Sequence, residues 1–477
     1  MSDIDAHDPE AFRAAGHRLI DGLTEHLIRA RAREGRAISA VPPQQLLEEI
    51  PAELPVDGGG DLVERLLEVA RRSTSVHHPG YVGHQVSTPL PQAALAELTG
   101  ALVNNGMAVY EMGQVHTVME RHVIEWMCSV LGFGAGAGGV LTHGGSLGNL
   151  TALLAARQAK AGHDIWSEGA SEPLALLVSD QAHYCVDRAA RIMGWGAGGA
   201  VAVPTDDRFR LRIDALGECL RRARSQGRRV LAVVASSCST ASGSFDPLEE
   251  IADFCAANDL WLHVDGAHGA SFALSDRTAD RLRGIERADS VVWDLHKLMA
   301  LPSLNTAVLF REGQRSYEAF AQEASYLFDD VEPSEEWFNV GRRTMECTKR
   351  ALSVTAYTML ETYGTAHFGR HVERLLDLTQ HLTGLVEAAP DFELAVEPEA
   401  NILCFRHVPA ATSGGLDELQ ARIRRRVLDG GRYYLVQARL RGALWLRTTL
   451  MNPHTTEADL AGLLDEIRAA AGSGAST

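Results

Sequence analysis

The chain has 477 residues, of which 45% are hydrophobic, and a formal net charge of −17. A chain of this length can bury a large core in two or three domains. Its acidity and the absence of a basic cluster argue against nucleic acid or an anionic membrane surface as a partner.

Cysteine usage and the N-terminus indicate the expected compartment. The seven cysteines are dispersed and form no C-x-x-C pair, which fits unlinked thiols in a reducing environment. Residues 1–8 are acidic and lack a signal-peptide pattern, and no apolar run reaches membrane-spanning length. We therefore expect a soluble, cytoplasmic protein.

The predicted elements fall into three regions. Residues 1–85 form an N-terminal helical segment that is interrupted by prolines. Over residues 86–360, apolar strands alternate with amphipathic helices, which is the pattern of a large α/β domain with a mostly parallel sheet. Residues 361–477 are predicted to form a small α+β domain, with helices at 367–388, at 416–428 and from 457, and strands at 402–405 and 443–449.

A glycine turn opens the α/β region. Gly144, Gly145 and Ser146 precede a strongly helical run at residues 150–157. Such a turn presents free N–H groups and the positive end of the helix dipole to an anion. Gly145 and Ser146 are therefore candidate phosphate contacts, although an ordinary glycine turn with a polar helix cap has the same pattern.

A histidine follows the next apolar strand, at residues 174–178. An imidazole at His183 can lie flat over an aromatic ligand and can transfer protons. Taken alone, a buried histidine satisfied by hydrogen bonds is the simpler interpretation.

Asp265 ends another apolar strand and is followed by Gly266 and Ala267. These small residues leave room for a ring near the backbone, and a carboxylate beside a pyridinium keeps the ring nitrogen protonated. An Asx cap is the plain alternative. A metal site with His263 and His268 is a further alternative, but no other His/Cys cluster completes a ligand set, so we predict no metal.

The most informative lysine is Lys297, which emerges from a buried strand predicted at residues 288–294. A lysine held away from bulk water becomes a usable nucleophile. Pyridoxal 5′-phosphate needs an amine for its Schiff base, an acid at its ring nitrogen and donors for its phosphate. The lysine, the carboxylate and the glycine turn together predict this cofactor.

In their order and spacing, these motifs resemble the pyridoxal-phosphate-dependent group II amino acid decarboxylases, the family of glutamate, aromatic amino acid, histidine and diaminobutyrate decarboxylases. The resemblance extends from about Pro79 to Pro453. It is carried by the sequences HPGY at 78–81, NNGM at 104–107, YE at 110–111, GGS at 144–146, SDQAH at 179–183, FDP at 245–247, HVD at 263–265 and DLHK at 294–297.

The resemblance implies a fold type I enzyme with a mostly parallel seven-stranded sheet in its large domain. It implies decarboxylation of an L-amino acid or an amino-acid conjugate, with release of CO2 and an amine. Lys297 would be the Schiff-base lysine, Asp265 the partner of the pyridinium and His183 the ring-stacking histidine. The other implied cofactor contacts are Gly145, Ser146, Thr240, Ala267, Asp294 and His296.

The resemblance also assigns the substrate contacts. Arg447 would receive the α-carboxylate, for which an arginine fork has the right geometry, although a surface ion pair is an alternative for this residue. Gln85 and Ser87 lie in a loop that is expected to select the side chain. Because the family builds its active sites at a subunit interface, we expect a homodimer.

One loop, at residues 329–339, departs from the family pattern. Many relatives carry a tyrosine there that protonates the carbanion left by decarboxylation, whereas this loop has none and places Ser334 near the expected position. Within the family, loss of that tyrosine accompanies oxidative deamination with O2, which releases an aldehyde. This reaction is the main alternative, and an aminotransferase-like enzyme and a non-catalytic fold type I protein are the others.

Overall fold

The computed structural model describes residues 6–320, 335–410 and 415–472, and the chain divides into two compact units. The larger unit comprises Gln85–Thr379 and Val396–Leu403. The smaller unit comprises Met1–His84, Gln380–Ala395 and Cys404–Thr477. The N-terminal segment is therefore grouped with the C-terminal region, and the expected division at residues 85 and 360 stays a prediction.

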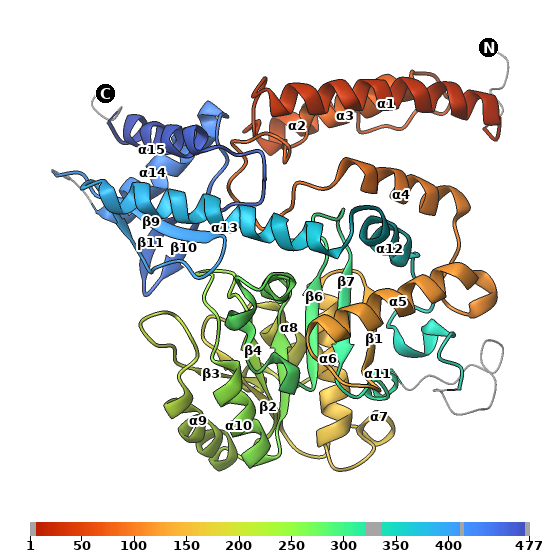
Figure 1. Ribbon diagram of the computed structural model, residues 1–477, viewed down its shortest axis with the longest axis vertical. Helices are drawn as coiled ribbons and strands as arrows, with labels where there is room; N and C mark the ends of the chain where they lie inside the picture. The colour runs from red at the N-terminus through yellow and green to blue at the C-terminus, as the bar shows by residue number, and fades with distance from the viewer. Residues whose placement is uncertain (1–5, 321–334, 411–414, 473–477) are drawn as a thin grey trace. The chain divides into compact units, whose positions relative to one another are not determined.

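A seven-stranded sheet organises the larger unit, in the order β1-β7-β6-β5-β4-β2-β3 (Figure 1). Strand β7 runs antiparallel to β1 and β6, and the other pairs are parallel, so the predicted mostly parallel sheet is confirmed. The strands are β1 (Gly138–Thr142), β2 (Leu174–Ser179), β3 (Ala200–Val203), β4 (Arg229–Ser236), β5 (Trp261–Asp265), β6 (Ser290–Asp294) and β7 (Thr306–Phe310).

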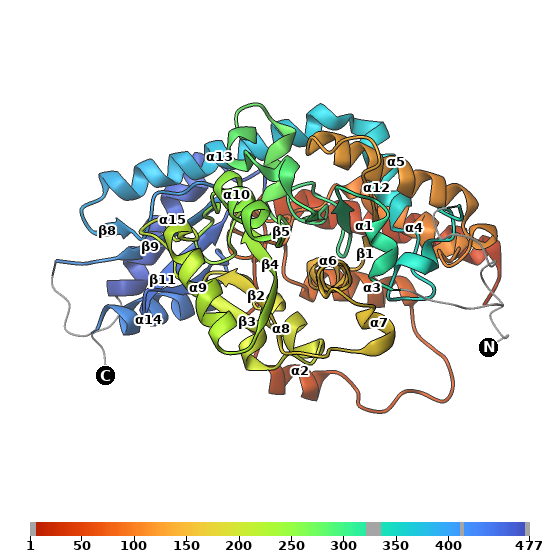
Figure 2. The ribbon, with the colours of Figure 1, turned by 90° about the horizontal axis from the view of Figure 1, so that it is seen from below.

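Helices cover both faces of this sheet. Figure 2 shows α6 and α8 on one face and α9 and α10 on the other. All residues of β2, β6 and β7 are consequently buried, which explains why these strands read as continuous apolar runs. The helices of this unit are α4 (Pro91–Val103), α5 (Gln114–Val130), α6 (Gly145–Lys160), α7 (Ile165–Glu168), α8 (Cys185–Ile192), α9 (Ile213–Ser225), α10 (Leu248–Asn258), α11 (Arg315–Glu318) and α12 (Leu352–Tyr363), with short 3-10 turns that include η6 (Val340–Arg343).

The smaller unit combines helices with a four-stranded sheet in the order β10-β11-β9-β8. Asp8 caps the first helix, and the guanidinium of Arg33 binds both carboxylate oxygens of Asp459 at 2.7 Å. The elements are α1 (Pro9–Arg31), α2 (Pro43–Glu49), α3 (Leu62–Arg72), α14 (Leu416–Gly430), α15 (Glu457–Gly472), β8 (Phe392–Leu394), β10 (Val436–Leu440) and β11 (Ala443–Thr449), while α13 (Thr365–Ala388) and β9 (Ile402–His407) contribute residues to both units.

The helices and strands predicted after residue 361 are confirmed, but two strands of the smaller unit were not predicted. Strand β8 has only three residues, which is too short for a periodic pattern. Strand β10 pairs with β11 across Arg441 and Gly442, which adopt positive φ angles of 49° and 81°. An arginine is an uncommon residue in this conformation, so the hairpin carries no ordinary turn signature.

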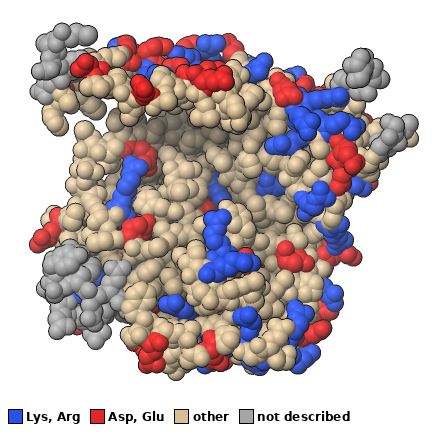
Figure 3. All heavy atoms as spheres, turned by 180° about the vertical axis from the view of Figure 1, so that it is seen from behind, with Lys and Arg blue, Asp and Glu red and all other residues tan. Residues whose placement is uncertain are grey.

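Among the described residues, no helix combines the length and the apolar character that a membrane span requires. On the face drawn in Figure 3, basic and acidic side chains are interspersed over the surface.

Candidate active site

The carboxyl ends of several strands surround a cavity of about 250 Å³ in the larger unit. Strands β1, β4, β5 and β6 point the same way, so the residues that follow them meet at one edge of the sheet, where α/β proteins bind ligands. The cavity is lined by His143, Gly144, Gly145, Ser146, Asn149, His183, Cys185, Ser236, Cys238, Ser239, Thr240, Asp265, Ala267, His268, Asp294, His296, Lys297 and Leu304.

Lys297 follows β6 and forms an ion pair with the last residue of that strand. Its Nζ lies 3.0 Å from Oδ2 of Asp294, while the hydroxyl of Thr306 on β7 donates to Oδ1 of Asp294 at 2.6 Å. Burial, the largest single influence, lowers the pKa of Lys297, but the carboxylates of Asp294 and Asp265 together raise it above its usual value. The resting amine is therefore an ammonium and must lose a proton before it can act as a nucleophile.

Asp265 ends β5 and reaches the same cavity as Lys297. One of its oxygens accepts a hydrogen bond from the backbone N–H of Ala267 at 3.2 Å, so the carboxylate also holds the turn that follows the strand. The Asx cap that was the plain alternative for Asp265 is therefore present, and the same residue also lies on the cavity wall.

His183 lies between β2 and α8. Its Nδ1 accepts a hydrogen bond from the backbone N–H of Cys185 at 3.4 Å, and its ring centre lies 4.2 Å from that of Tyr184. Burial lowers the pKa of His183, and the nearby Asp265 carboxylate partly opposes this effect. A neutral imidazole in a cavity wall can stack on an aromatic ring and can exchange a proton.

The glycine turn brings the N-terminus of α6 to the cavity. Gly144 has a φ of +90°, a left-handed conformation that favours glycine. A Cβ atom on Gly145 would lie 3.2 Å from both carboxylate oxygens of Asp294, so a larger residue here would require the Asp294 side chain to shift. The free N–H groups of this first turn and the helix dipole suit an anion.

A second layer of polar contacts holds this turn in place. The side-chain amide of Asn149 donates to the carbonyl of Gly145 at 2.8 Å, and Nε2 of His263 lies 2.7 Å from Oδ1 of Asn149. The other ring nitrogen of His263 lies 2.8 Å from the hydroxyl of Ser290, and burial lowers the pKa of His263 to about 4. Both nitrogens of this histidine are therefore occupied by hydrogen bonds rather than available to a ligand.

The cavity wall combines an amine, a carboxylate, an imidazole and a helix N-terminus. These are the groups that pyridoxal phosphate requires for its aldehyde, its ring nitrogen, its ring face and its phosphate, so the residues present fit this cofactor. All nine residues predicted to contact it line the same cavity: Gly145, Ser146, His183, Thr240, Asp265, Ala267, Asp294, His296 and Lys297.

Several lining residues were not predicted as contacts. The end of β4 and the residues directly after it contribute Ser236, Cys238 and Ser239. Cys238 adopts a φ of +71°, which no sequence pattern predicts. A run of small polar residues directly after a buried strand was the available signal, because that strand ends at the same edge as β5. The others are His143, Gly144, Asn149, Cys185, His268 and Leu304.

The predicted substrate contacts stay predictions. Gln85 and Ser87 are not among the described residues that line the cavity, and the hydroxyl of Ser87 donates to the backbone carbonyls of His296 and Leu301 at 3.0 and 3.2 Å. Ser87 thereby supports the backbone next to Lys297. Arg447 is buried on β11 in the smaller unit, and its role as a carboxylate receptor stays a prediction. Ser334 lies outside the described residues.

Comparison with known proteins places these observations in a family context. Residues 47–408 match the pyridoxal-dependent decarboxylase conserved domain. The chain is 28% identical to an aromatic-L-amino-acid decarboxylase of Bacillus atrophaeus over 97% of this chain and 96% of the relative. It is 30% identical to an L-aspartate decarboxylase of Metarhizium robertsii over 78% of this chain and 75% of the relative. The crystal structure of mouse CSAD matches with a TM-score of 0.89 at 28% identity, covering 97% of this chain and 99% of that one.

Proposed function

The chain belongs to the pyridoxal-dependent decarboxylase family, and from this premise we propose which of its residues hold the cofactor and process the substrate. The protein is a fold type I, pyridoxal-phosphate-dependent amino acid decarboxylase, as the motifs predicted. When bound, pyridoxal phosphate supplies a cationic ring that accepts the electron pair left by the departing CO2.

The proposed roles rest on one observation, the cavity of about 250 Å³ whose wall carries both Lys297 and Asp265. Lys297 would supply the amine that holds the cofactor aldehyde. Asp265 keeps a proton on the ring nitrogen, because a carboxylate stabilises a neighbouring cation. His183 covers the face of the ring. The phosphate is received by the backbone N–H groups of Gly145 and Ser146.

The remaining predicted contacts complete this arrangement. Ala267 has a small side chain on the cavity wall and would leave room for the ring. Asp294 orients the amine of Lys297 through the ion pair at 3.0 Å. Thr240 and His296 belong to the polar shell, and Nδ1 of His296 is held at 2.9 Å from the carbonyl of Asn305.

The substrate is an α-amino acid whose carboxylate is received by Arg447, with Gln85 and Ser87 in the loop that selects its side chain. A bidentate guanidinium suits this carboxylate better than a lysine would. The relatives bear names that cover aromatic and acidic substrates, so the first screen must contain both classes.

One set of measurements tests the proposal. Borohydride reduction of the holoenzyme, followed by peptide mass spectrometry, is expected to leave the cofactor on Lys297. Incubation with amino acids is expected to release CO2 and an equal amount of amine. A Lys297→Ala variant serves as the control that binds no cofactor covalently. A label on another lysine would overturn the assignment of this site.

The absence of a tyrosine from residues 329–339 gives the aldehyde-forming reaction a specific motivation. Oxygen consumption is therefore recorded in the same assay. Amine without oxygen consumption supports the decarboxylase that the comparisons favour, whereas aldehyde and consumed oxygen would replace it by the oxidative variant. Transfer of the amino group without CO2 would indicate an aminotransferase.

A homodimer is part of the proposal. Large apolar side chains on α4 and α5 are each more than a third exposed, namely Leu95, Leu98, Leu102, Val115 and Val118. Such surface is expensive to leave in water and suits a subunit interface. Light scattering is expected to give twice the mass of the chain. A monomer that is fully active would contradict the dimer.

We also propose a cytoplasmic location, which rests on the unlinked thiols.

A further inference from the structure

Strand β1 lies at the edge of the seven-stranded sheet, and charged side chains take the place of a neighbouring strand. Three of them are spaced three residues apart in one segment: Arg343, Glu346 and Lys349. Nη1 of Arg343 donates to the carbonyl of Gly139 at 3.2 Å, and Nζ of Lys349 donates to the carbonyl of Leu141.

The third of these side chains, Glu346, makes its contact just beyond the end of the strand. Nδ1 of His143 donates to Oε1 of Glu346 at 2.9 Å, and this contact lowers the pKa of the Glu346 carboxyl. The segment therefore binds the backbone carbonyls of residues 139 and 141 on the edge of β1 and the side chain of His143, which directly follows the strand.

A buried ion pair reinforces the middle contact. Both oxygens of Glu120 on α5 accept hydrogen bonds from Lys349, at 2.6 and 2.8 Å, and Oε1 of Glu120 also accepts the N–H of Leu141 at 3.0 Å. The side chains of Lys349 and Glu120 are 0% and 4% exposed. Burial lowers the pKa of Lys349, and the Glu120 carboxylate partly reverses this effect. Both polar backbone groups of Leu141 are thus bound by one ion pair.

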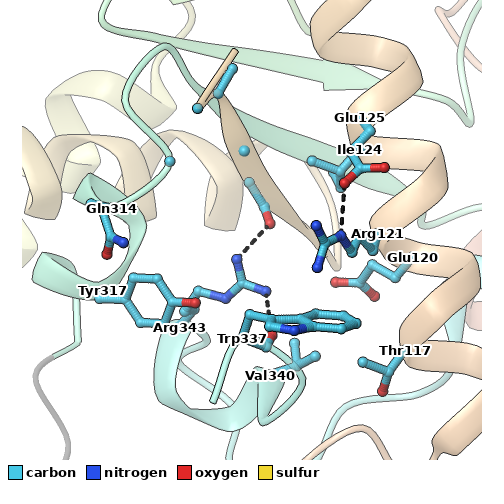
Figure 4. A pocket seen from close by; sticks show the side chains of 15 residues that line it. Thr117, Glu120, Arg121, Ile124, Glu125, Gln314, Tyr317, Trp337, Val340 and Arg343 are labelled. Carbon is cyan, nitrogen blue, oxygen red and sulfur yellow. Dashed lines mark hydrogen bonds and ion pairs between the residues drawn. The ribbon is translucent and has the colours of Figure 1, made fainter. Parts of the chain in front are cut away.

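We call Glu120, Arg343, Glu346 and Lys349 the edge clamp. Figure 4 shows Arg343 extending from η6 to the backbone of β1 and Glu120 projecting from α5 beside it. In the same view Glu125, one turn further along α5, pairs with Arg121 instead, at 2.7 Å.

The opposite side of β1 is also constrained. A Cβ atom on Gly139 would lie 2.1 Å from the carbonyl oxygen of Val308, so β1 and β7 are in very close approach. The strand cannot move toward β7 and is held on its free side by the clamp. Thr142 ends this strand, and His143 leads directly into the turn at Gly144 and Gly145.

A buried ion pair is weak evidence for stability, because apolar side chains of similar volume often stabilise a core as well. Its value lies in the geometry that its directional hydrogen bonds impose. We propose that the edge clamp is a positioning device that acts through β1 to hold the glycine turn where it receives the phosphate of the cofactor. This inference rests on the proposed function of that turn.

The test compares the affinity of the apoenzyme for pyridoxal 5′-phosphate and for pyridoxal, which lacks the phosphate. The variants are Glu346→Gln and the double variant Glu120→Leu/Lys349→Met, which replaces the ion pair by apolar side chains. Loss of hydrogen bonds to charged groups is expected to weaken binding of the phosphate form by about tenfold and binding of pyridoxal by less than about twofold. The matched control, Glu125→Gln, changes the same helix without touching β1 and is expected to alter neither affinity.

Circular dichroism and thermal unfolding of the apoenzyme show whether each variant folds. If the double variant does not fold, Glu346→Gln decides the outcome alone. Equal losses for both ligands, or no loss, would overturn the clamp as a positioning device. If the unaltered protein itself binds pyridoxal as tightly as the phosphate form, the proposed phosphate site fails instead, so the two failures are distinguishable.

Discussion

Replacing Asp294 by asparagine tests whether the ion pair at the end of β6 controls the amine of Lys297. The two groups are 3.0 Å apart, and their side chains are 2% and 20% exposed. Opposite unit charges at this separation attract by about 5 kcal/mol at an effective dielectric constant of about 20. Measured net values for hydrogen bonds to charged groups are about 1.5–3 kcal/mol. This energy stabilises the ammonium form, so the substitution is expected to lower the pKa of Lys297.

The direction of this pKa change follows from the groups that remain around Lys297. Burial favours the neutral amine, while the carboxylates of Asp294 and Asp265 favour the ammonium form. When one carboxylate becomes an amide, burial weighs more heavily, and the neutral nucleophilic amine forms at lower pH.

The assay follows the reaction of the apoenzyme with a lysine-selective acylating reagent over a pH series, with modification of Lys297 quantified by mass spectrometry. The matched control is Asp259→Asn, which removes the partner of Lys160 at 2.6 Å. Asp259 has a φ of +53°, a conformation that asparagine tolerates, so this control should fold and leave Lys297 unchanged. If the pH midpoint of Lys297 acylation stays constant or rises in Asp294→Asn, the ion pair does not hold the proton on the amine, and the reasoning is refuted.

Three further outcomes are expected. Asp265→Asn should reduce decarboxylation by about a hundredfold or more while the cofactor stays attached, because one group that stabilises the developing charge is lost; a change below about tenfold would contradict its role. Gly145→Ala should weaken cofactor binding, since its Cβ would lie 3.2 Å from the carboxylate of Asp294, whereas Gly134→Ala, with nothing within 4 Å, should bind normally in the same titration. His263→Gln should lower the free energy of unfolding, measured by chemical denaturation, and this decrease should be smaller at pH 5 than at pH 7.5 by about 2 kcal/mol. In the folded chain the pKa of His263 is about 4, which lies below the unfolded value. As the pH falls, the unfolded chain therefore takes up the proton first, and the stability due to His263 is lost. An equal decrease at both pH values would contradict this.

Three of the proposed cofactor residues could be identified from the sequence because each follows a local pattern. Asp265 and Lys297 come after continuous apolar runs, and Gly145 opens a helix. Buried parallel strands read as such runs, and their carboxyl ends share one edge of the sheet. Order along the chain was therefore enough to predict that Asp265, Lys297 and Gly145 lie at one edge of the sheet, and all three line the cavity.

The contacts that support this cavity could not be predicted in the same way. Glu120 and Lys349 are separated by 229 positions, and neither lies in a motif that was singled out. Ser87 lies in a loop that was expected to select the substrate, yet its hydroxyl is used by the backbone beside Lys297. A polar side chain on a helix or loop has many possible partners, and only the packing of the folded chain selects one.

The amino-acid order alone determined the sheet, the strand ends and the residue types that pyridoxal phosphate needs, because apolar periodicity and turn residues act over short stretches of chain. Tertiary structure alone decided that the free edge of β1 is closed by Glu120 and Lys349, and that Asp294 lies against both Lys297 and Gly145. Apart from the pair of Asp294 and Lys297, which are three residues apart, these contacts join residues far apart in the sequence, so their distances are set by how strands and helices pack rather than by any local preference.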